Sequence, residues 1–373
     1  MHPTHAIIRL DYLAHNMRQI CSRLQPGVKA MAVVKANAYG HGAIPVARTV
    51  LASGASYLAV AHLEEGAELR EAGITVPILV LGLALPEQFD YYARYNLIAT
   101  ISSPDYLSKL AETARHFKTN ISVMLKVDTG MGRIGVPSQQ IVPLAQAIAD
   151  YPELTRIGLF SHFATADVPG GSNLSKKQAE RFFSACENLD KAGLGAGLRT
   201  LSNSAGILQL PETHADLVRA GVILYGMPPA PSLTPLMTDL KPVMELYTKV
   251  VYIKETPADT TISYGATYTT RERTHIATLP IGYADGYSRQ LSNKGEVLIR
   301  GKRYPIVGRI CMDQMMIDLG SDEPSFGVGE PVTLVGASGN EAISFTDLAA
   351  LIGTINYELT CLVTSRVPRI YHS

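Results

Sequence analysis

The chain has 373 residues, of which 46% are hydrophobic and 18% charged, which is typical of a globular protein and excludes a disordered one. Lysine plus arginine and aspartate plus glutamate each number 33, so no basic excess favours nucleic acid or an acidic membrane as partner. Single cores stop growing at about 250–300 residues, so two domains are expected. The 4 cysteines lack a CxxC spacing and the N-terminal residues do not resemble a signal peptide, so we expect a cytoplasmic protein and no metal site.

Eight apolar, strand-like segments alternate with helical segments over the first part of the chain. They are residues 31–35, 57–61, 77–82, 97–101, 121–128, 156–163, 198–203 and 217–226. Strands that are apolar on both faces and joined by helices indicate parallel βα units. Eight such units favour a closed (β/α)8 barrel of the TIM type over an open sheet.

This alternation stops at residues 226–242, where five prolines are incompatible with a helix or a central strand. Strand-like segments dominate beyond it, interrupted by one helical patch at residues 345–353. We therefore expect an α/β barrel domain at residues 12–235 and a separate, mostly β domain at residues 236–373. An extra strand within residues 1–11 is expected to belong to the second domain.

Polar side chains stand where the predicted barrel strands end. They are Lys35 and Tyr39 after the first strand, Lys126 and Arg133 after the fifth, His162 after the sixth, Asn203 and Ser204 after the seventh, and Arg219 and Tyr225 around the eighth. The carboxyl ends of barrel strands line the active site, and the last two loops often hold a phosphate. A lysine opposite a phosphate site is the arrangement that pyridoxal phosphate needs, because the lysine forms a Schiff base while the anion is held elsewhere.

A G-x-G-x-x-G match at residues 130–135 raises a dinucleotide site as an alternative. Pro137 follows almost at once and the preceding strand is fifth in the series, so the context disfavours this alternative. In the second domain, the patches TISYGATY, IGYADGYSR and GRICMDQ are unusual, but composition alone leaves turn or packing roles open for their tyrosines and for Cys311.

Taken together, the motifs resemble those of bacterial alanine racemase, a pyridoxal phosphate enzyme of fold type III. The motifs are VVKANAYGHG, KVDTGMGRIG, SNSAG, VRAGVILYG, SYGATY, IGYADGY, GRICMDQ and INYE, which follow the family's order over nearly the whole chain. The barrel motifs also fit related decarboxylases, whereas the tyrosine motif of the second domain does not.

The resemblance implies a role for each of these residues. Lys35 would carry the cofactor, and Tyr264 would be a second catalytic base that reaches in from the partner subunit of a homodimer. Arg219 would face the pyridine nitrogen, and Arg133 and Met312 would receive the carboxylate of alanine. Lys126 would be a possible site of carbamylation. The other cofactor-binding residues would be Tyr39, His162, Asn203, Ser204, Gly221, Val222 and Tyr357.

The implied reaction needs residues of these types. Racemisation removes the α-proton from one face and returns a proton to the other, which two bases on opposite faces achieve. Free lysine and tyrosine side chains have pKa values of ~10.4 and ~10, so cationic neighbours are needed to favour their basic forms. An arginine cannot lend its proton, so Arg219 would leave the pyridine nitrogen unprotonated and limit transamination. Thr200 stands where some family members carry a histidine behind this arginine. The residue that contacts Arg219 from behind is therefore expected to differ from the one in those members.

Three alternatives remain open at the level of the sequence. One is a broad-specificity or serine racemase, because one methyl or hydroxyl changes selectivity by only ~1–3 kcal/mol. The second, an amino-acid decarboxylase of the same fold, is disfavoured by an arginine where a carboxylate would be expected. The third is a non-catalytic pyridoxal phosphate carrier, which would not need the second domain. The sequence also leaves open whether D-alanine would be made for peptidoglycan or degraded.

Overall fold

The structure, a computed structural model, describes residues 3–373, and the chain divides into two compact units. The first contains Leu13–Ala38 and Ala43–Lys241. The second contains Pro242–Ser373, residues 3–12 and the short segment Tyr39–Gly42. Each unit has its own sheets and its own buried apolar residues.

Eight parallel strands form the first unit. They are β2 (Lys29–Val33), β3 (Tyr57–Val60), β4 (Ile78–Val80), β5 (Ala99–Ile101), β6 (Ile121–Asp128), β8 (Leu154–Phe160), β9 (Leu198–Thr200) and β10 (Leu217–Ala220). Regular ladders join β10-β2-β3-β4 and β5-β6-β8-β9. A parallel bridge between Leu79 and Ile98 joins β4 to β5, and the Arg219 N–H donates to the Ser202 carbonyl at 3.0 Å between β10 and the end of β9. The ring is therefore closed, and the predicted (β/α)8 barrel is confirmed.

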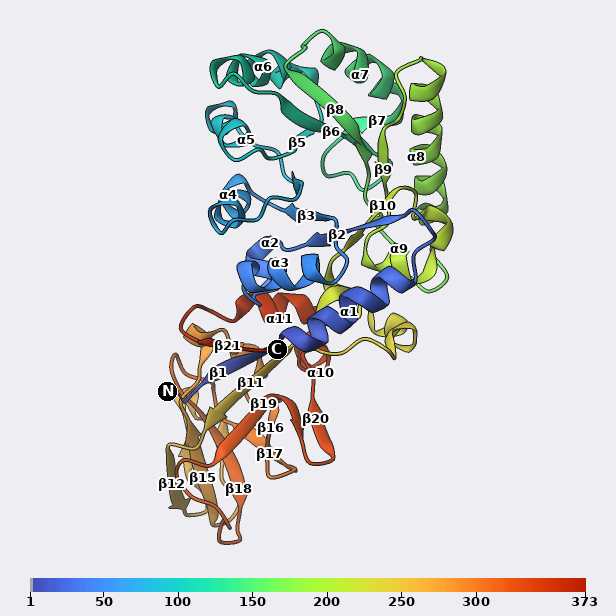
Figure 1. The fold of residues 1–373 in the computed structure, drawn as a ribbon. Coiled ribbons are helices and arrows are strands. Elements are labelled where there is room, and N and C mark those ends of the chain that lie inside the picture. Colours follow the sequence, from blue (N-terminus) through green and yellow to red (C-terminus); the bar gives the residue numbers. More distant parts are fainter. Residues whose placement is uncertain (1–2) are drawn as a thin grey trace. The chain divides into compact units, whose positions relative to one another are not determined.

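Helices lie outside this ring of strands (Figure 1). They are α1 (Leu10–Ser22), which begins in the other unit, and α3 (Ala43–Ala52), α4 (Leu63–Glu71), α5 (Asp90–Arg94), α6 (Leu107–His116), α7 (Ile141–Ala149), α8 (Asn173–Lys191) and α9 (Ser204–Gln209). Helix α6 illustrates why they cover the barrel, because it buries Leu107, Leu110, Ala111 and Ala114. Residues at this spacing share one helix face, which packs on the apolar strands. A two-residue strand, β7 (Val136–Pro137), extends the edge of β6.

The second unit is built on a ten-stranded sheet with the order β12-β15-β18-β17-β16-β19-β11-β1-β21, and β20 pairs with β19. The strands are β1 (His5–Arg9), β11 (Met244–Lys249), β12 (Tyr252–Thr256), β15 (Thr274–Leu279), β16 (Glu296–Ile299), β17 (Lys302–Val307), β18 (Met315–Gly320), β19 (Pro331–Ser338), β20 (Glu341–Ile343) and β21 (Arg369–His372). Strand β1 pairs antiparallel with β11 and parallel with β21. Alternate residues of β11 and β18 are buried, as in a sheet with one covered face.

A small hairpin and two helices complete this unit. The hairpin pairs β13 (Thr261–Ile262) with β14 (Tyr268–Thr269), and the helices are α10 (Phe345–Ile352) and α11 (Asn356–Leu362). Ser344 caps α10 by accepting from the Asp347 N–H, and Gly353 ends it in the left-handed conformation. Across residues 3–373, every helix is too short or too polar to cross a lipid bilayer.

Gly158 on β8 provides a test of barrel closure. A Cβ added there would lie 2.0 Å from the carbonyl oxygen of Leu198, its partner on β9. We expect Gly158→Ala to lower the apparent melting temperature by ~5–10 °C, because the strands must move apart. Gly327→Ala is the control, since a Cβ there meets open space. Equal melting of the two variants in calorimetry would contradict the close approach of β8 and β9.

Candidate active site

Lys35 begins a turn of unusual handedness. The segment α2 (Lys35–Tyr39) follows β2, and Ala36, Asn37, Ala38 and Tyr39 have φ values of 52°, 51°, 54° and 52°. Left-handed helical geometry costs roughly 1–2 kcal/mol for each residue other than glycine. Four such residues in succession are therefore a strained segment, and such strain persists only where the surroundings hold it.

The carboxylate of Glu65 holds this turn. Its Oε1 accepts from the Ala36 N–H at 2.6 Å, and its Oε2 accepts from the Ala61 and His62 N–H groups at 2.7 and 3.2 Å. Glu65 lies in the first turn of α4, where the helix dipole favours a negative charge. One anionic side chain thus fastens the start of α4, after β3, to the first residue after Lys35.

Positive charge is concentrated near the carboxyl ends of the barrel strands. Lys126 on β6 is 2% exposed and Arg219 on β10 is 3% exposed. The Lys126 Nζ and the Arg219 Cζ lie 5.4 and 5.8 Å from the centre of the Phe160 ring. The Lys126 ammonium donates to the Val127 carbonyl at 2.8 Å. The two buried cations therefore lie against the same aromatic side chain, which is a favourable but neutral partner.

The charges perturb one another. Burial, and then the charge of Arg219, lowers the pKa of Lys126 to about 7. Burial also lowers the pKa of His162 well below its usual range, and the charges of Arg219, Arg133, Lys126 and Lys35 add to this effect. Burial and Arg133 lower the pKa of Arg219 to about 9, so its guanidinium stays charged at neutral pH. His162 is consequently a neutral imidazole in a cationic environment.

Arg219 is fixed by hydrogen bonds from both terminal nitrogens. Its Nη1 donates to the carbonyl and the hydroxyl of Thr200 at 2.9 and 2.8 Å. Its Nη2 donates to the carbonyls of Ser161 and Leu201 at 2.6 and 3.0 Å and contacts the His162 Nδ1 at 3.2 Å. Because arginine only donates, the His162 Nδ1 accepts and the proton lies on Nε2. Thr200, the departure noted in the sequence, supports Arg219 directly.

The loops after β9 and β10 meet through a serine. Ser204 is buried at the start of α9, and its Oγ accepts from the Gly221 N–H at 3.0 Å. Asn203 caps α9 by accepting from the Gly206 N–H at 3.0 Å. Val222 begins the short 3-10 turn Val222–Tyr225 directly after Gly221. Hydroxyl and backbone amide groups from two successive loops are therefore gathered at one place, as an anion site requires.

The G-x-G-x-x-G segment is shaped by an internal carboxylate. Asp128, at the end of β6, accepts from the N–H groups of Gly130, Met131 and Gly132 at 2.9 to 3.1 Å. Burial acts to raise the pKa of Asp128, but these amide bonds outweigh it and hold the pKa below its usual range. The chain's own carboxylate thus occupies these amides, which argues against a dinucleotide phosphate there. The same loop presents Arg133 at the surface.

Four of the expected residues lie in the β-rich unit. Tyr264 is 70% exposed and Met312 is 54% exposed. The rings of Tyr39 and Tyr357 meet edge to face with their centres 6.5 Å apart. The segment that contains Tyr39 is also fastened there by Arg369, whose Nε donates to the Gly40 carbonyl at 3.1 Å.

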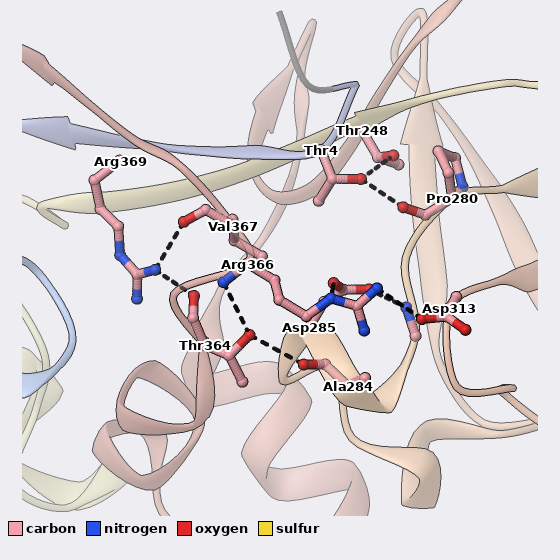
Figure 2. Close-up of polar contacts among 11 residues, drawn as sticks. Thr4, Thr248, Pro280, Ala284, Asp285, Asp313, Thr364, Arg366, Val367 and Arg369 are labelled. Carbon is pink, nitrogen blue, oxygen red and sulfur yellow. Dashed lines mark hydrogen bonds and ion pairs between the residues drawn. The ribbon is translucent and has the colours of Figure 1, made fainter.

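The motifs around Met312 hold each other in place. The Tyr283 and Ala284 N–H groups donate to the carbonyls of Cys311 and Met312 at 3.1 and 3.0 Å. Figure 2 shows the Arg366 guanidinium between two carboxylates, at 2.7 Å from Asp313 and 3.3 Å from Asp285. The IGYADGY and GRICMDQ motifs therefore act as one framework that presents Met312 at the surface.

The structure differs in two respects from the expectation that the polar residues at the strand ends line one site. The Tyr225 hydroxyl is buried and donates to the Val33 carbonyl at 2.9 Å, so it serves the packing of the barrel. Glu65 was not singled out by the sequence, because it lies in a segment with ordinary helical charge patterning. The feature that could have identified Glu65 is its place in the first turn of a helix that follows a barrel strand.

Known families match both units. Residues 8–229 match the family "Alanine racemase, N-terminal domain", and residues 243–371 match "Alanine racemase, C-terminal domain". The chain is 45% identical over 369 residues to the alanine racemase of Halothermothrix orenii, covering 99% of this chain and 97% of that protein. It is 44% identical over 369 residues to that of Desulfovibrio desulfuricans, covering 99% and 98%.

Solved structures agree with these matches. An alanine racemase from Clostridium difficile superimposes with a TM-score of 0.94 at 38% identity, covering all of this chain and 96% of that one. An alanine racemase from Bacillus anthracis, solved with bound L-Ala-P, also has a TM-score of 0.94, at 37% identity and with coverage of 100% and 96%. The chain therefore belongs to the alanine racemase family of pyridoxal phosphate-dependent isomerases.

Proposed function

We propose that Lys35 and Tyr264 are the two acid–base groups with which this alanine racemase interconverts L- and D-alanine. The observation that carries the assignment of Lys35 is its position. It begins the strained turn that comes after β2, and its charge acts on His162, which contacts Arg219. A lysine held rigidly at the carboxyl end of a barrel strand, next to buried cations, suits a covalent anchor for an anionic cofactor.

The barrel residues fit pyridoxal phosphate, which carries a phosphate and an acidic ring hydroxyl. Among the described residues, neither Lys126 nor Arg219 forms an ion pair with a carboxylate. An anion is therefore the missing partner of this cluster. The phosphate would be held by Ser204, Gly221, Val222, Tyr39 and Tyr357. Asn203 caps the helix that begins at Ser204, and His162, which contacts Arg219, would lie at the cofactor ring. When bound, the cofactor supplies an electron sink that acidifies the α-proton of alanine.

Arg219 would face the pyridine nitrogen. Its two terminal nitrogens are occupied by Thr200, Ser161, Leu201 and His162, so the guanidinium is held in one orientation. It remains charged and cannot give up a proton to the ring nitrogen. This moderates the electron sink, which favours return of a proton to alanine over side reactions.

Lys35 and Tyr264 would exchange protons with the α-carbon from opposite faces. The amine of Lys35 accepts a proton when it is neutral and donates one when it is charged, as a group that acts in both directions requires. The neutral His162 keeps its Nε2–H as a donor and adds no further positive charge. The exposed phenol of Tyr264 is free of packing constraints on most of its surface, which suits a group that acts on a substrate outside its own unit.

Arg133 and Met312 would receive the substrate carboxylate, and Lys126 would support Arg133. With a pKa of about 7, about half of the Lys126 amines are neutral at neutral pH. A neutral amine can attack carbon dioxide, forming an N–C bond and releasing a proton. The resulting carbamate would replace a cation that repels Arg133 by an anion that attracts it.

The enzyme would be a homodimer whose active sites combine two chains. Tyr264 is exposed on the β-rich unit, whereas Lys35 belongs to the barrel unit. A two-fold dimer can place the tyrosine of each chain at the lysine of the other and so form two equivalent sites. We also propose a cytoplasmic location, because the scattered cysteines suit a reducing compartment.

The anchor is tested by labelling. Borohydride reduction of the holoenzyme should fix the cofactor on the peptide that contains Lys35, as read by mass spectrometry. Lys35→Ala should lower racemisation by several orders of magnitude, since it removes both an anchor and a base. Lys29→Ala, at the exposed start of β2, is the matched control and should leave the rate unchanged. Label on another lysine would refute the assignment.

The role of Arg219 is tested by Arg219→Glu. A carboxyl group should protonate the ring nitrogen, so we expect racemisation to fall by ~10²-fold or more while pyruvate formation from alanine rises. Circular dichroism should first confirm folding, because five hydrogen bonds to the guanidinium are lost. In Thr200→Val the guanidinium stays, so pyruvate formation should stay low. No rise in pyruvate for folded Arg219→Glu would show that this residue does not face the ring.

The shared site is tested by mixing two variants of very low activity, Lys35→Ala and Tyr264→Phe, under conditions that allow subunit exchange. In a mixed dimer, one site has both defects and the other has neither. Random exchange makes half of the dimers mixed, so roughly a quarter of the parental activity should return. A mass tag on one variant confirms the exchange. If activity stays near zero after exchange, both residues come from the same chain.

A further inference from the structure

The residue before Tyr264 has a backbone conformation that is normally reserved for glycine. Ser263 has φ 64° and ψ −176°. This region is essentially restricted to glycine, because a Cβ clashes with the neighbouring peptide groups. Gly265 and Ala266 also have positive φ values, 72° and 46°. The residues on both sides of Tyr264 thus have backbone conformations that L-residues rarely adopt. Ser263 has a side chain although its conformation favours glycine.

The side chain of Ser263 explains why the position is not glycine. Its Oγ donates to the Arg309 carbonyl at 2.6 Å and lies 3.4 Å from the Cys311 Sγ. Gly308 permits this approach, because a Cβ there would lie 2.8 Å from the Ser263 Cβ and 2.6 Å from the Ile262 carbonyl oxygen. The strained residue is therefore tied by its hydroxyl to the segment that carries Cys311 and Met312.

A second connection holds the other end of the tyrosine turn. The Asn293 Nδ2 donates to the Thr267 Oγ1 at 3.1 Å, and the Asn293 Oδ1 accepts from the Gly308 N–H at 2.6 Å. Asn293 thus joins Thr267 to the same segment that Ser263 contacts. The turn from Ser263 to Thr267 is fastened at both ends, while the Tyr264 side chain between them is 70% exposed.

We propose that Ser263 is a positioning residue that acts through Tyr264. Its hydrogen bond to Arg309 holds the glycine-like backbone that fixes the direction of the exposed phenol. This inference rests on the proposed role of Tyr264 as a catalytic base. Because few contacts within its own chain restrain the phenol, the backbone must determine the orientation of the Tyr264 side chain. Small errors in that orientation slow proton transfer.

Two replacements of Ser263 separate the effect of backbone strain from that of the hydrogen bond to Arg309. Ser263→Gly removes the strain and the tether together, so the protein should be as stable as the parent or more so, with a mobile turn. Ser263→Ala keeps the strain and loses the tether, so it should melt at a lower temperature. Both should lower kcat by ~10–100-fold with a smaller change in KM, because Arg133 is untouched. Ser338→Ala is the control, since that serine accepts from the Gly301 N–H elsewhere in the unit.

Hydrogen exchange provides a measure that does not depend on activity. Peptides that cover residues 263–268 should exchange faster in Ser263→Gly and Ser263→Ala than in the parent, and at the parental rate in Ser338→Ala. A role in stability alone predicts that kcat follows the melting temperature. The proposal predicts that Ser263→Gly loses kcat without losing stability. Parental kcat in Ser263→Gly, or unchanged exchange in both variants, would overturn the proposal.

A double-mutant cycle separates this inference from the proposed function. If Ser263 acts through Tyr264, then Ser263→Gly should cause no further loss in a Tyr264→Phe background. An equal loss in both backgrounds would show that Ser263 acts by another route and would overturn the proposal. If Tyr264→Phe alone kept full activity, the role of Tyr264 would fail, and the exchange data would still report whether Ser263 holds the turn.

Discussion

The candidate site in the barrel is organised around a buried cluster of positive charge, formed by Lys126 and Arg219. Lys126 and Arg219 are almost completely buried next to the same ring, and their partners among the described residues are carbonyl, hydroxyl and imidazole groups. Buried charge without a counter-ion is costly, and here its effects are visible in the lowered pKa values of Lys126 and His162. A site of this kind is completed by a bound anion. Pyridoxal phosphate, the cofactor of the family, is an anion: its ring hydroxyl would bring negative charge towards these cations, and its phosphate would be held by the loops after β9 and β10.

Strained backbone lies next to both proposed bases, Lys35 and Tyr264. A left-handed turn follows Lys35 and is fastened by Glu65, and a glycine-like residue precedes Tyr264 and is fastened by its own hydroxyl. Residues in rarely populated backbone regions persist where the surroundings hold them, and they gather at functional sites. In this chain, polar side chains provide that restraint in both places. The result is that each base projects from backbone whose direction is fixed before any ligand binds.

Much of the barrel could be predicted from the sequence, because its signal is local. Apolar strands such as β3 and β6 are separated by helices whose buried residues recur at helical spacing, and this alternation is visible in a single chain. The rim residues followed from the rule that barrel strands present their carboxyl ends to the ligand. Roles for Tyr264 and Met312 came only from the resemblance, since nothing in their local composition separates them from turn residues.

Other features depend on contacts that are distant in the sequence. Alanine has the highest propensity for right-handed helix, so a left-handed turn through Ala36 and Ala38 has no local signal. It exists because Glu65, nearly 30 residues later, accepts its first amide. Likewise, Thr200 could be recognised as a departure, but only the structure shows that its hydroxyl and carbonyl both support Arg219. Side chains that stabilise an improbable backbone are therefore the part of this site that sequence reading misses.

The most direct test of this account compares the melting temperature of the cofactor-free protein with and without saturating pyridoxal phosphate or pyridoxal. Both compounds can react with Lys35, but only the first brings the phosphate. Because a ligand that binds the folded state stabilises it, pyridoxal phosphate should raise the melting temperature by ~5 °C or more, and pyridoxal by much less. Raising the salt concentration should not abolish the difference, since Ser204 and Gly221, which would hold the phosphate, are buried. Equal stabilisation by the two compounds would contradict the claim that the loops after β9 and β10, which meet at Ser204 and Gly221, hold the phosphate of the cofactor.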